Sequence, residues 1–532
     1  MKKYFFILLV IAVLSIWPFF SKGFYQSHDG EWMIIRFTAF HQTLRAGNFP
    51  VRFVDRLNNS YGYPVINFLY PLPFYLSEIP KISGFGFVDS VKIIFAFSTL
   101  ISAAAMFWAL SIGFSPTASL TGAIIYLFIP YRFVDLYVRG SIGENLAFSV
   151  LPLILGSIFQ ISKGKKIYFP LLAIFIGLLI TSHNVIAAIF LPIFIVLSFL
   201  LIMHDRAKLL ISYALGILSA AFFWFPALYD LKYVKLSQIN VSNVNDHLVS
   251  FSRLIIPSWG YGSRPVGHLG FSPQIGIVAV AVLLTALYIQ IISKKKNVSI
   301  NFFLVITTAC IFLLTTWSKI IWNTIPAISV IQFPWRLLSV IVFISSFCAA
   351  FVIDSNKRNK TLLATLLISA SVISTIVYTK PSGFVNRGEG YYTTNEGSTT
   401  VLDEYLPLWV QENPKGHPNQ KIEVENGKST LTQVAIKPNN YKFTLNASEE
   451  TKIKVNTIFF PGWKVFANGN PIKIDYKNPE GLIKFKLPKG NYDVIIRYTK
   501  TLPHLVSEIV SLFAVFSTGL YFFLIKWRKL GF

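Results

Sequence analysis

The feature that most constrains this chain is a series of apolar, uncharged segments, each about 15 to 22 residues long. A helix of about 20 apolar residues spans the hydrocarbon core of a bilayer. Of the 532 residues, 53% are hydrophobic and 14% are charged, whereas a soluble globular protein has roughly 25% charged residues. The composition excludes an ordinary soluble enzyme and predicts a polytopic membrane protein. Because Cys310 and Cys348 both lie inside apolar segments, neither a disulfide framework nor a cysteine zinc site is expected.

Twelve of these segments are predicted to be transmembrane helices. They are residues 4–20, 90–110, 117–134, 144–161, 167–181, 185–203, 208–229, 275–293, 301–317, 337–353, 361–378 and 505–525. Clusters of Lys and Arg occupy the short connections at 163–166, 206–208, 294–296, 357–360 and 526–529. Such clusters stay in the cytoplasm, and the helix count between them keeps all of them on one side. Both termini are therefore predicted to be cytoplasmic. The net charge of +24 reflects the orientation of the helices in the membrane and does not indicate nucleic-acid binding.

Residues 21–89 are predicted to form a long first external loop. The stretch 64–82 is apolar but contains four prolines, which break helices, so it is expected to lie at the outer interface without spanning. Before it, Met33, Phe37, Phe40 and Leu44 recur at helical spacing. This pattern predicts a helix lying in the interface plane, ended by Gly47 and Pro50.

Residues 379–503 change from helical blocks to alternating apolar and polar positions, with turns at 426–427, 468–469 and 489–490. Seven or eight short strands are expected there, which indicates an extracytoplasmic β-sandwich. The expected architecture is a polytopic all-α membrane protein with an all-β domain before the last helix. Its parts are residues 1–378, the sandwich 379–503, and a final helix with a basic cytoplasmic tail, 504–532.

The charged residues of the helical part map to the external ends of the predicted helices. They are Asp29, Arg132, Asp135, Arg139, Glu144, His183, Asp230, Arg336 and Glu508. Ionisable groups next to a bilayer are costly and indicate a functional site or a structural ion pair. A carrier coupled to ions usually has polar groups near the midplane, so this distribution favours a protein that works at the outer surface.

Each candidate residue has a structural and a functional interpretation. Asp29 is suited to cap the helix that follows it, and equally to act as a general base or a metal ligand. In the segment 131–145, Asp135, Arg139 and Glu144 either form simple salt bridges or provide a guanidinium for phosphate and a carboxylate for metal or acceptor. His183 caps a tight turn or contacts a ligand. Arg336 snorkels to the interface or binds donor phosphate.

Several short motifs, taken in order, resemble a known family. They are Tyr63-Pro64, Tyr70-Pro71-Leu72-Pro73, Arg139-Gly140 with Glu144, Ser182-His183-Asn184, Phe333-Pro334-Trp335-Arg336, Glu404-Tyr405-Leu406-Pro407 and Phe460-Pro461-Gly462-Trp463. The chain resembles the bacterial membrane family labelled 6-pyruvoyl-tetrahydropterin synthase-related and its YfhO-like relatives. Its first third also resembles GT-C glycosyltransferases, such as the aminoarabinose transferases and protein O-mannosyltransferases.

This resemblance implies that a sugar is transferred, with inversion, from a polyprenyl-phosphate donor to a glycan, lipid or protein acceptor at the outer face of a bacterial cytoplasmic membrane. Asp29 would be the base or a site-organising ligand, and Glu144 or Asp135 the second carboxylate. Arg139 and Arg336 would hold the donor phosphate. His28-Asp29 replaces the paired acidic motif of other GT-C enzymes, so a divalent metal, Mg²⁺ or Mn²⁺, at Asp29 and Glu144 stays an open question.

Two other functions share the same lipid chemistry. A transporter or flippase of lipid-linked saccharide would need polar groups along a path through the membrane, and such groups are scarce in the apolar segments. A non-catalytic assembly factor for envelope polymers would keep the helical part and use the sandwich for binding. Substitution of Asp29 separates them, because only a catalyst loses turnover while its fold stays intact.

Overall fold

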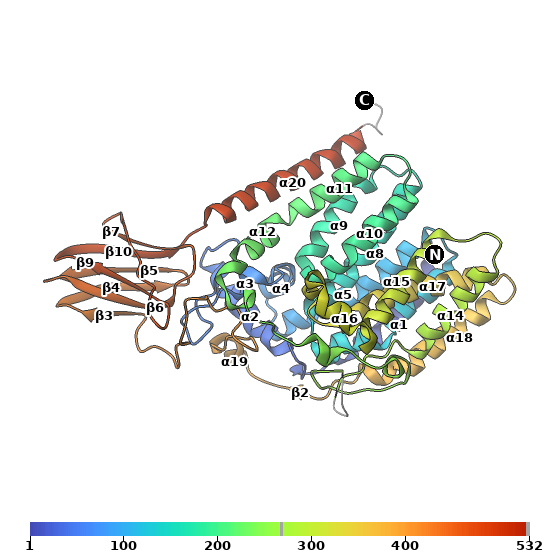
Figure 1. Cartoon of the computed structure of the whole chain (residues 1–532), viewed down its shortest axis with the longest axis horizontal. Coiled ribbons are helices and arrows are strands. Elements are labelled where there is room, and N and C mark those ends of the chain that lie inside the picture. Colours follow the sequence, from blue (N-terminus) through green and yellow to red (C-terminus); the bar gives the residue numbers. More distant parts are fainter. Residues whose placement is uncertain (266–269, 528–532) are drawn as a thin grey trace.

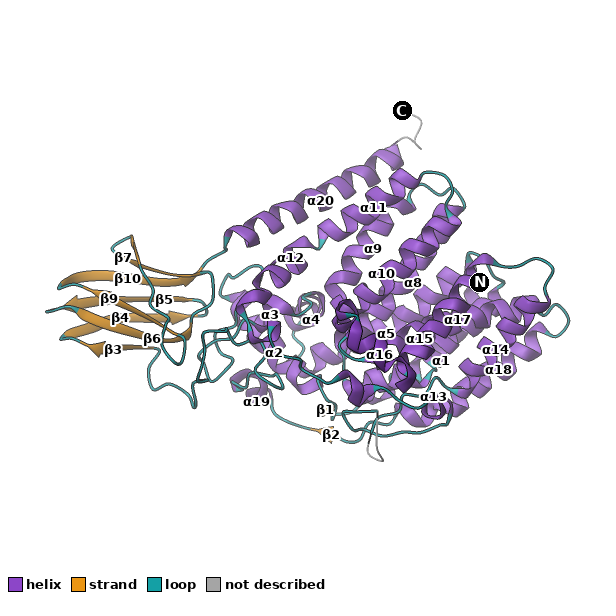
Figure 2. Ribbon diagram, viewed as in Figure 1, coloured by secondary structure: helices purple, strands orange, loops and turns teal. Residues whose placement is uncertain are grey.

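A computed structural model describes residues 1–265 and 270–527 of the chain. It is mostly helical, with a β domain near the C-terminus, and the strands extend away from the helical part (Figures 1 and 2). Among the described residues, six helices are long and apolar enough to cross a membrane, or eight if each of two bent helix pairs counts as one span. Arg528 and Lys529 of the predicted cytoplasmic tail lie outside the described residues.

Each of the twelve predicted spans contains helix. The six long helices are α5 (Phe87–Ser111), α8 (Ile142–Ser162), α10 (Asn184–Leu201), α17 (Leu338–Ser355, preceded by a turn from Pro334), α18 (Lys360–Thr375) and α20 (Leu502–Trp527). Shorter ones are α1 (Lys2–Val13), α9 (Tyr168–Ser182), α14 (Ile277–Ile292) and α15 (Val298–Leu314). The count of twelve spans stays a prediction, since α1 has 12 residues and α9 has 15, fewer than the roughly 17 needed to cross a bilayer.

Two predicted spans are bent. In the first, α6 (Pro116–Leu127) is followed by α7 (Pro130–Phe133) and by η2, a π-helical segment (Val134–Arg139), with a bend of 48°. In the second, α11 (Arg206–Ser219) and α12 (Ala221–Asp230) meet at 63°. The bend before Pro130 follows from the missing backbone donor of proline. After the bend, η2, most of which lies between the predicted spans 117–134 and 144–161, is buried in the interior.

Small residues allow the central helices to approach closely. A Cβ atom on Gly122 of α6 would lie 2.7 Å from the carbonyl oxygen of Ser346 on α17, and the Ser346 hydroxyl donates to the Gly122 carbonyl at 2.7 Å. Contacts of this kind hold helices together in lipid, where the hydrophobic effect between helices is weak. They fix α17, and with it Arg336 in the turn before its first residue.

The first external loop contains three helices, α2 (Gly30–Arg45), α3 (Val65–Phe68) and α4 (Leu72–Ile82). The predicted helix before Gly47 is confirmed as α2, and 64–82 forms no long helix, as expected. The structure differs in one respect. The sequence predicted a helix with one apolar face, yet α2 is buried from Met33 through Phe40. The reason is that α4, α5 and a short helix far along the chain, α19 (Glu389–Thr394), all pack against it.

The β domain is a sandwich of two antiparallel sheets, as predicted. One sheet has the order β4-β5-β10-β7-β8 and the other β3-β6-β9. The strands are β3 (Ile422–Asn426), β4 (Ser429–Lys437), β5 (Asn440–Ala447), β6 (Thr451–Ile458), β7 (Trp463–Ala467), β8 (Asn470–Ile472), β9 (Leu482–Leu487) and β10 (Gly490–Tyr498). Its core is continuous with Phe53 and Phe68 of the first loop, so the sandwich is anchored to the helical part.

Between α18 and the sandwich, the chain lies against the first loop. The two-residue strand β2 (Phe384–Val385) pairs with β1 (Phe24–Tyr25), and Arg36 of α2 donates to Thr399. Strands of the sandwich occupy 422–498. The segment before them therefore belongs spatially with the first loop, where the candidate site lies.

Candidate functional site

Polar side chains from distant parts of the chain line one cavity of about 310 Å³. It lies at the helix ends where α8 and α10 begin and η2 finishes, whereas the basic connections 163–166 and 357–360 lie at the opposite ends of α8 and α17. The polar and aromatic residues lining it include His28, Asp29, Trp32, Arg36, Tyr70, Arg139, His183, Gln332, Trp335, Arg336, Glu404 and Tyr405. Four of the six predicted site residues are in this set: Asp29, Arg139, His183 and Arg336.

Backbone hydrogen bonds hold Asp29 beside Arg139. The amide of His28 donates to the carbonyl oxygen of Val138 at 3.0 Å, and the amide of Asp29 donates to that of Arg139 at 2.8 Å. Gly140 makes this approach possible. Its φ is +68°, and a Cβ atom there would lie 2.5 Å from the Ser27 hydroxyl oxygen and 3.0 Å from the Gly30 nitrogen. The local chain geometry thus requires glycine after Arg139.

Asp29 precedes α2 but does not cap it. Its side chain accepts no hydrogen bond from the first turn of the helix. Among the residues that the structure describes, its carboxylate has no hydrogen-bond or ion-pair partner. Capping, one of the two interpretations of Asp29, therefore does not occupy the carboxylate, which lines the cavity and is partly exposed.

The other two predicted carboxylates lie behind Arg139 and outside the cavity lining. One guanidinium nitrogen of Arg139 lies 2.8 Å from Asp135 Oδ1 and 2.5 Å from Glu144 Oε2. The phenol of Tyr131 donates to the other oxygen of Glu144 at 2.6 Å. Both carboxylates are fully buried. Their contacts indicate that Asp135 and Glu144 position Arg139 and do not themselves face a ligand.

His183 lies in the tight turn between α9 and α10. It caps the start of α10 and also lines the cavity. Its Nδ1 accepts from the amide of Ile186 at 3.2 Å, so the neutral ring carries its proton on Nε2. The ring stacks on Tyr70 with centroids 4.8 Å apart. Gly143 leaves room for this pair, because a Cβ atom there would lie 2.2 Å from the Tyr70 ring. Burial and the nearby Asp29 carboxylate raise the pKa of Tyr70, so its hydroxyl stays protonated.

Two guanidinium groups in the cavity lining have no carboxylate partner within the described chain: those of Arg36 and Arg336. Arg336 donates to Gln332 Oε1 at 2.7 Å and to the carbonyl oxygen of Ile331 at 3.0 Å, and its Nε has no partner. Arg36 donates through Nε to the Thr399 hydroxyl at 3.0 Å. Both side chains are only 7% exposed. A buried cation without a counter-charge is costly, and an anion in the cavity would supply that charge.

Arg36, Glu404, Tyr405 and Trp335 line the cavity but were not predicted as site residues. Trp335 packs under the Arg139 guanidinium, 4.3 Å from its ring centroid. Glu404 is 8% exposed, and burial raises the pKa of Tyr405 to about 12. A signal for Arg36 was present, because it lies among the apolar residues of the predicted helix. Glu404 and Tyr405 belong to one of the family motifs, but they are more than 360 residues from Asp29, and local pattern carries no information on their pairing with the first loop.

The predicted metal ligands do not form a joint site. Both oxygens of Glu144 are engaged by Tyr131 and Arg139, which leaves Asp29 as the unengaged carboxylate of the pair. Among the described residues, no group of three His, Cys, Asp or Glu side chains has a metal-binding arrangement. The residues present therefore do not fit a metal ion held by Asp29 and Glu144 together.

Comparison with known sequences places this chain in a family. A family model described as 6-pyruvoyl-tetrahydropterin synthase related domain, membrane protein, matches residues 66–382, more than half of the 532 residues. The chain belongs to this family. The family membership predicted from the motifs is confirmed, and the match covers Arg139, Glu144, His183 and Arg336 but not Asp29 or the sandwich.

The individual proteins that this chain resembles are distant from it in sequence. An uncharacterised protein of Lactococcus lactis subsp. cremoris (strain MG1363) is 25% identical over 316 residues, which are 56% of this chain and 50% of that protein. The chain thus spans half the length of that curated relative. Among solved structures, the mycobacterial arabinofuranosyltransferase AftD has a TM-score of 0.46 at 14% identity, covering 74% of this chain and 28% of that one. An oligosaccharyltransferase of Archaeoglobus fulgidus has a TM-score of 0.46 at 15% identity, covering 74% and 56%.

Proposed function

We propose that this protein is a membrane glycosyltransferase that transfers a sugar from a polyprenyl-phosphate donor to an envelope glycan, lipid or protein acceptor. The observation that carries the proposal is the composition of the 310 Å³ cavity, which combines two buried, unpaired guanidinium groups with one unpaired carboxylate. The protein would lie in the bacterial cytoplasmic membrane with both termini inside, so that the cavity and the sandwich face outwards.

The two arginines suit the phosphate of such a donor. Phosphate departure creates negative charge that a planar guanidinium stabilises with two parallel hydrogen bonds. The positive charges of Arg36 and Arg336 have no carboxylate partner in the described chain and are available to the phosphate. The positive charge of Arg139 is already balanced by Asp135 and Glu144. Arg139 would instead stabilise the wall of the cavity, with one edge of its guanidinium facing the cavity.

Asp29 is the group suited to activate the acceptor. In the proposed reaction its carboxylate takes the proton of an acceptor hydroxyl as that oxygen bonds to the anomeric carbon. The bond between the anomeric carbon and the phosphate oxygen breaks on the opposite side, and the electron pair leaves with the phosphate. The configuration of the sugar inverts, and no step passes through a metal.

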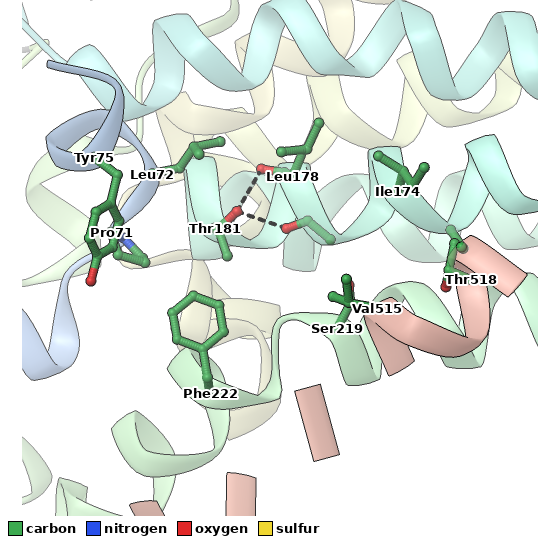
Figure 3. A pocket seen from close by; sticks show the side chains of 13 residues that line it. Pro71, Leu72, Tyr75, Ile174, Leu178, Thr181, Ser219, Phe222, Val515 and Thr518 are labelled. Atoms are coloured by element: carbon green, nitrogen blue, oxygen red, sulfur yellow. Dashed lines mark hydrogen bonds between the residues drawn. The ribbon is translucent and has the colours of Figure 1, made fainter. Parts of the chain in front are cut away.

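An apolar groove beside the cavity suits the isoprenoid tail. The groove has a volume of about 420 Å³ and lies between α4, α9, α11–α12 and α20 (Figure 3). Tyr70 of the cavity precedes Pro71 of the groove, and Thr181 of the groove lies two residues before His183. The hydroxyl of Thr181 donates to its own helix at Gly177, 2.8 Å away. Val515 of the groove is 56% exposed and lies on α20, which is long and apolar enough to cross a membrane, so in this proposal the groove opens towards the bilayer.

The experiment is transfer of radiolabelled sugar from a panel of polyprenyl-phosphate sugars by purified protein in lipid, with and without divalent metal. Asp29→Asn should abolish transfer while donor binding and thermal stability persist. Glu31→Gln is the matched control, because Glu31 lies two residues after Asp29, in the first turn of α2, but pairs with Arg387 at 3.0 Å. Failure of transfer with every donor, together with equal lipid binding by both proteins, would favour the transporter or the assembly factor.

A further inference from the structure

The two sheets of the sandwich differ in how their outward-facing cations are balanced. On the three-stranded sheet, every lysine of β6 and β9 has a glutamate partner. Lys452 lies 2.9 Å from Glu425, Lys454 lies 2.7 Å from Glu423, Lys486 lies 2.8 Å from Glu450, and Lys484 also pairs with Glu425. This sheet is therefore close to electrically balanced.

The outer face of the five-stranded sheet carries four exposed cations: Lys437 on β4, Lys442 on β5, Lys464 on β7 and Arg497 on β10. None of them has an acidic partner within ion-pair distance in the described part of the chain. The one carboxylate on the neighbouring positions, Asp493, accepts a hydrogen bond from Thr444 at 3.1 Å.

The strand register places these cations in a row. Arg497 is directly opposite Lys464 on one side and Asn440 on the other, and Asn440 is opposite Lys437. The row therefore crosses the four strands β7, β10, β5 and β4. Adjacent strands lie about 4.8 Å apart. Lys442 follows Asn440 by two residues and points to the same face. The register thus concentrates positive charge along one line across the sheet.

The unbalanced charges of this row cost the fold stability. Like charges at directly opposite positions, such as Arg497 and Lys464, destabilise a sheet. The guanidinium of Arg497 lies 5.1 Å from the Phe466 ring centroid, which supports the side chain but leaves its charge unbalanced. An anionic ligand would relieve the repulsion along the whole row.

The row continues into a groove at the junction with the helical part. Lys437 also lines this groove, which has a volume of about 310 Å³. Of the other basic side chains there, Lys421 pairs with Asp55 of the same lining at 2.9 Å and His417 pairs with Glu396 at 2.9 Å. Arg56, like Lys437, has no carboxylate within ion-pair distance in the described part of the chain. The Nε atom of Arg56 is buried and has no hydrogen-bond partner. Gln42 and Thr43 of α2 also line this groove, and the first half of α2 lines the cavity described above.

We propose that this row and groove bind a flexible polyanionic polymer that carries phosphate groups. A chain can follow the row across the sheet and enter the groove beside α2. A flat bilayer surface cannot enter that groove, which favours a polymer over anionic lipid headgroups. Guanidinium and ammonium groups together suit phosphate oxygens. The binding site is separate from the cavity and does not depend on the proposed sugar transfer.

The test uses full-length protein in discs of zwitterionic phosphatidylcholine and fluorescently labelled linear polyphosphate as the probe, with binding followed by anisotropy over a range of salt concentrations. The variant Lys442→Gln/Lys464→Gln/Arg497→Gln removes three cations of the row. The control Lys452→Gln/Lys454→Gln/Lys486→Gln removes three paired lysines of the other sheet, so the net charge changes equally. Thermal melting verifies that both proteins are folded.

Affinity for polyphosphate should fall at least tenfold in the row variant and less than twofold in the control. The slope of log affinity against log salt should fall by about 2 to 3 in the row variant, because each cation displaces counterions from a linear polyanion. Equal losses in the two variants, or no loss in either, would overturn the proposal. Equally tight binding of polyglutamate would overturn the assignment of phosphate, and a difference seen only in discs with anionic lipid would assign the row to the membrane surface.

Discussion

The backbone amide of Asp29 donates to the carbonyl oxygen of Arg139 at 2.8 Å and joins the first external loop to the end of a bent helix 110 residues later. This bond sets a carboxylate without a partner beside a guanidinium that has two. The cavity therefore contains an unpaired carboxylate next to a wall whose charges are already paired.

Replacement of Gly140 tests whether this junction maintains the cavity. In Gly140→Ala, the residue at φ +68° is strained and its Cβ meets Ser27, so we expect a loss of roughly 1 to 3 kcal/mol in stability and a larger loss of transfer. The measurement is thermal melting in detergent together with the transfer assay. Gly113→Ala is the control, because nothing lies within 4 Å of its Cβ position. Equal melting of both variants would contradict the role of the junction.

The ion pairs behind Arg139 predict strong energetic coupling. Arg139→Gln leaves Asp135 and Glu144 buried without their cation, which should cost about 3 to 5 kcal/mol. The double variant Arg139→Gln/Glu144→Gln should be more stable than the sum of the single changes indicates, since it removes one of the stranded charges. Denaturation of all the variants in the same detergent gives the coupling energy. Simple additivity would show that these groups do not act as a unit.

Substitutions of His183 can distinguish its role as the cap of α10 from a contact with a ligand. Asparagine is a good helix cap, so His183→Asn should keep the start of α10 within about 0.5 kcal/mol of the wild type, whereas His183→Ala should lose about 1 kcal/mol. Both variants lose the ring that stacks on Tyr70 in the cavity. Transfer should therefore fall in both, and stability in the alanine variant alone. Full activity of the asparagine variant would limit His183 to a structural role.

His247 predicts a pH dependence of the loop beside Trp335. Its Nδ1 accepts from the Trp335 indole at 3.3 Å, and burial lowers its pKa to about 4. The usual pKa of histidine is about 6.5, so the folded state favours the neutral ring. The stabilisation is complete above about pH 6.5 and is lost as the pH falls towards 4. Tryptophan fluorescence and hydrogen exchange of residues 244–255 should report loosening across this window. In His247→Gln the pH dependence should disappear.

The apolar groove predicts a dependence on the length of the lipid. Gly519 lines the groove and has nothing within 4 Å of its Cβ position, so the side chain of Gly519→Phe can begin in open space, and we expect its ring to occupy the groove. Use of long-chain polyprenyl donors should fall at least tenfold, while short-chain donors are affected less. Leu512→Phe is the control, since Leu512 lies on the same helix, is 70% exposed and does not line the groove. Equal effects on short and long donors would argue against a tail in this groove.

The sequence located four residues of the candidate cavity through a single physical rule. Charged groups at membrane helix ends are rare, so Asp29, Arg139, His183 and Arg336 stood out before any contact was known. The same rule identified Asp135 and Glu144, but it could not distinguish a carboxylate that faces a ligand from one that neutralises its neighbour. That distinction depends on interatomic distances of 2.5 and 2.8 Å to one guanidinium.

The sequence by itself determined the class of the protein, the positions of its apolar helices, the sandwich and the family, because hydropathy, period and short motifs are local properties of the chain. The tertiary structure decided which charges are paired, that the segment 389–405 covers α2, and that Arg36 and Glu404 join the cavity. These features depend on contacts between residues hundreds of positions apart. Burial removes water as the alternative partner, so the energy of each charged group is set by the neighbours that folding brings to it.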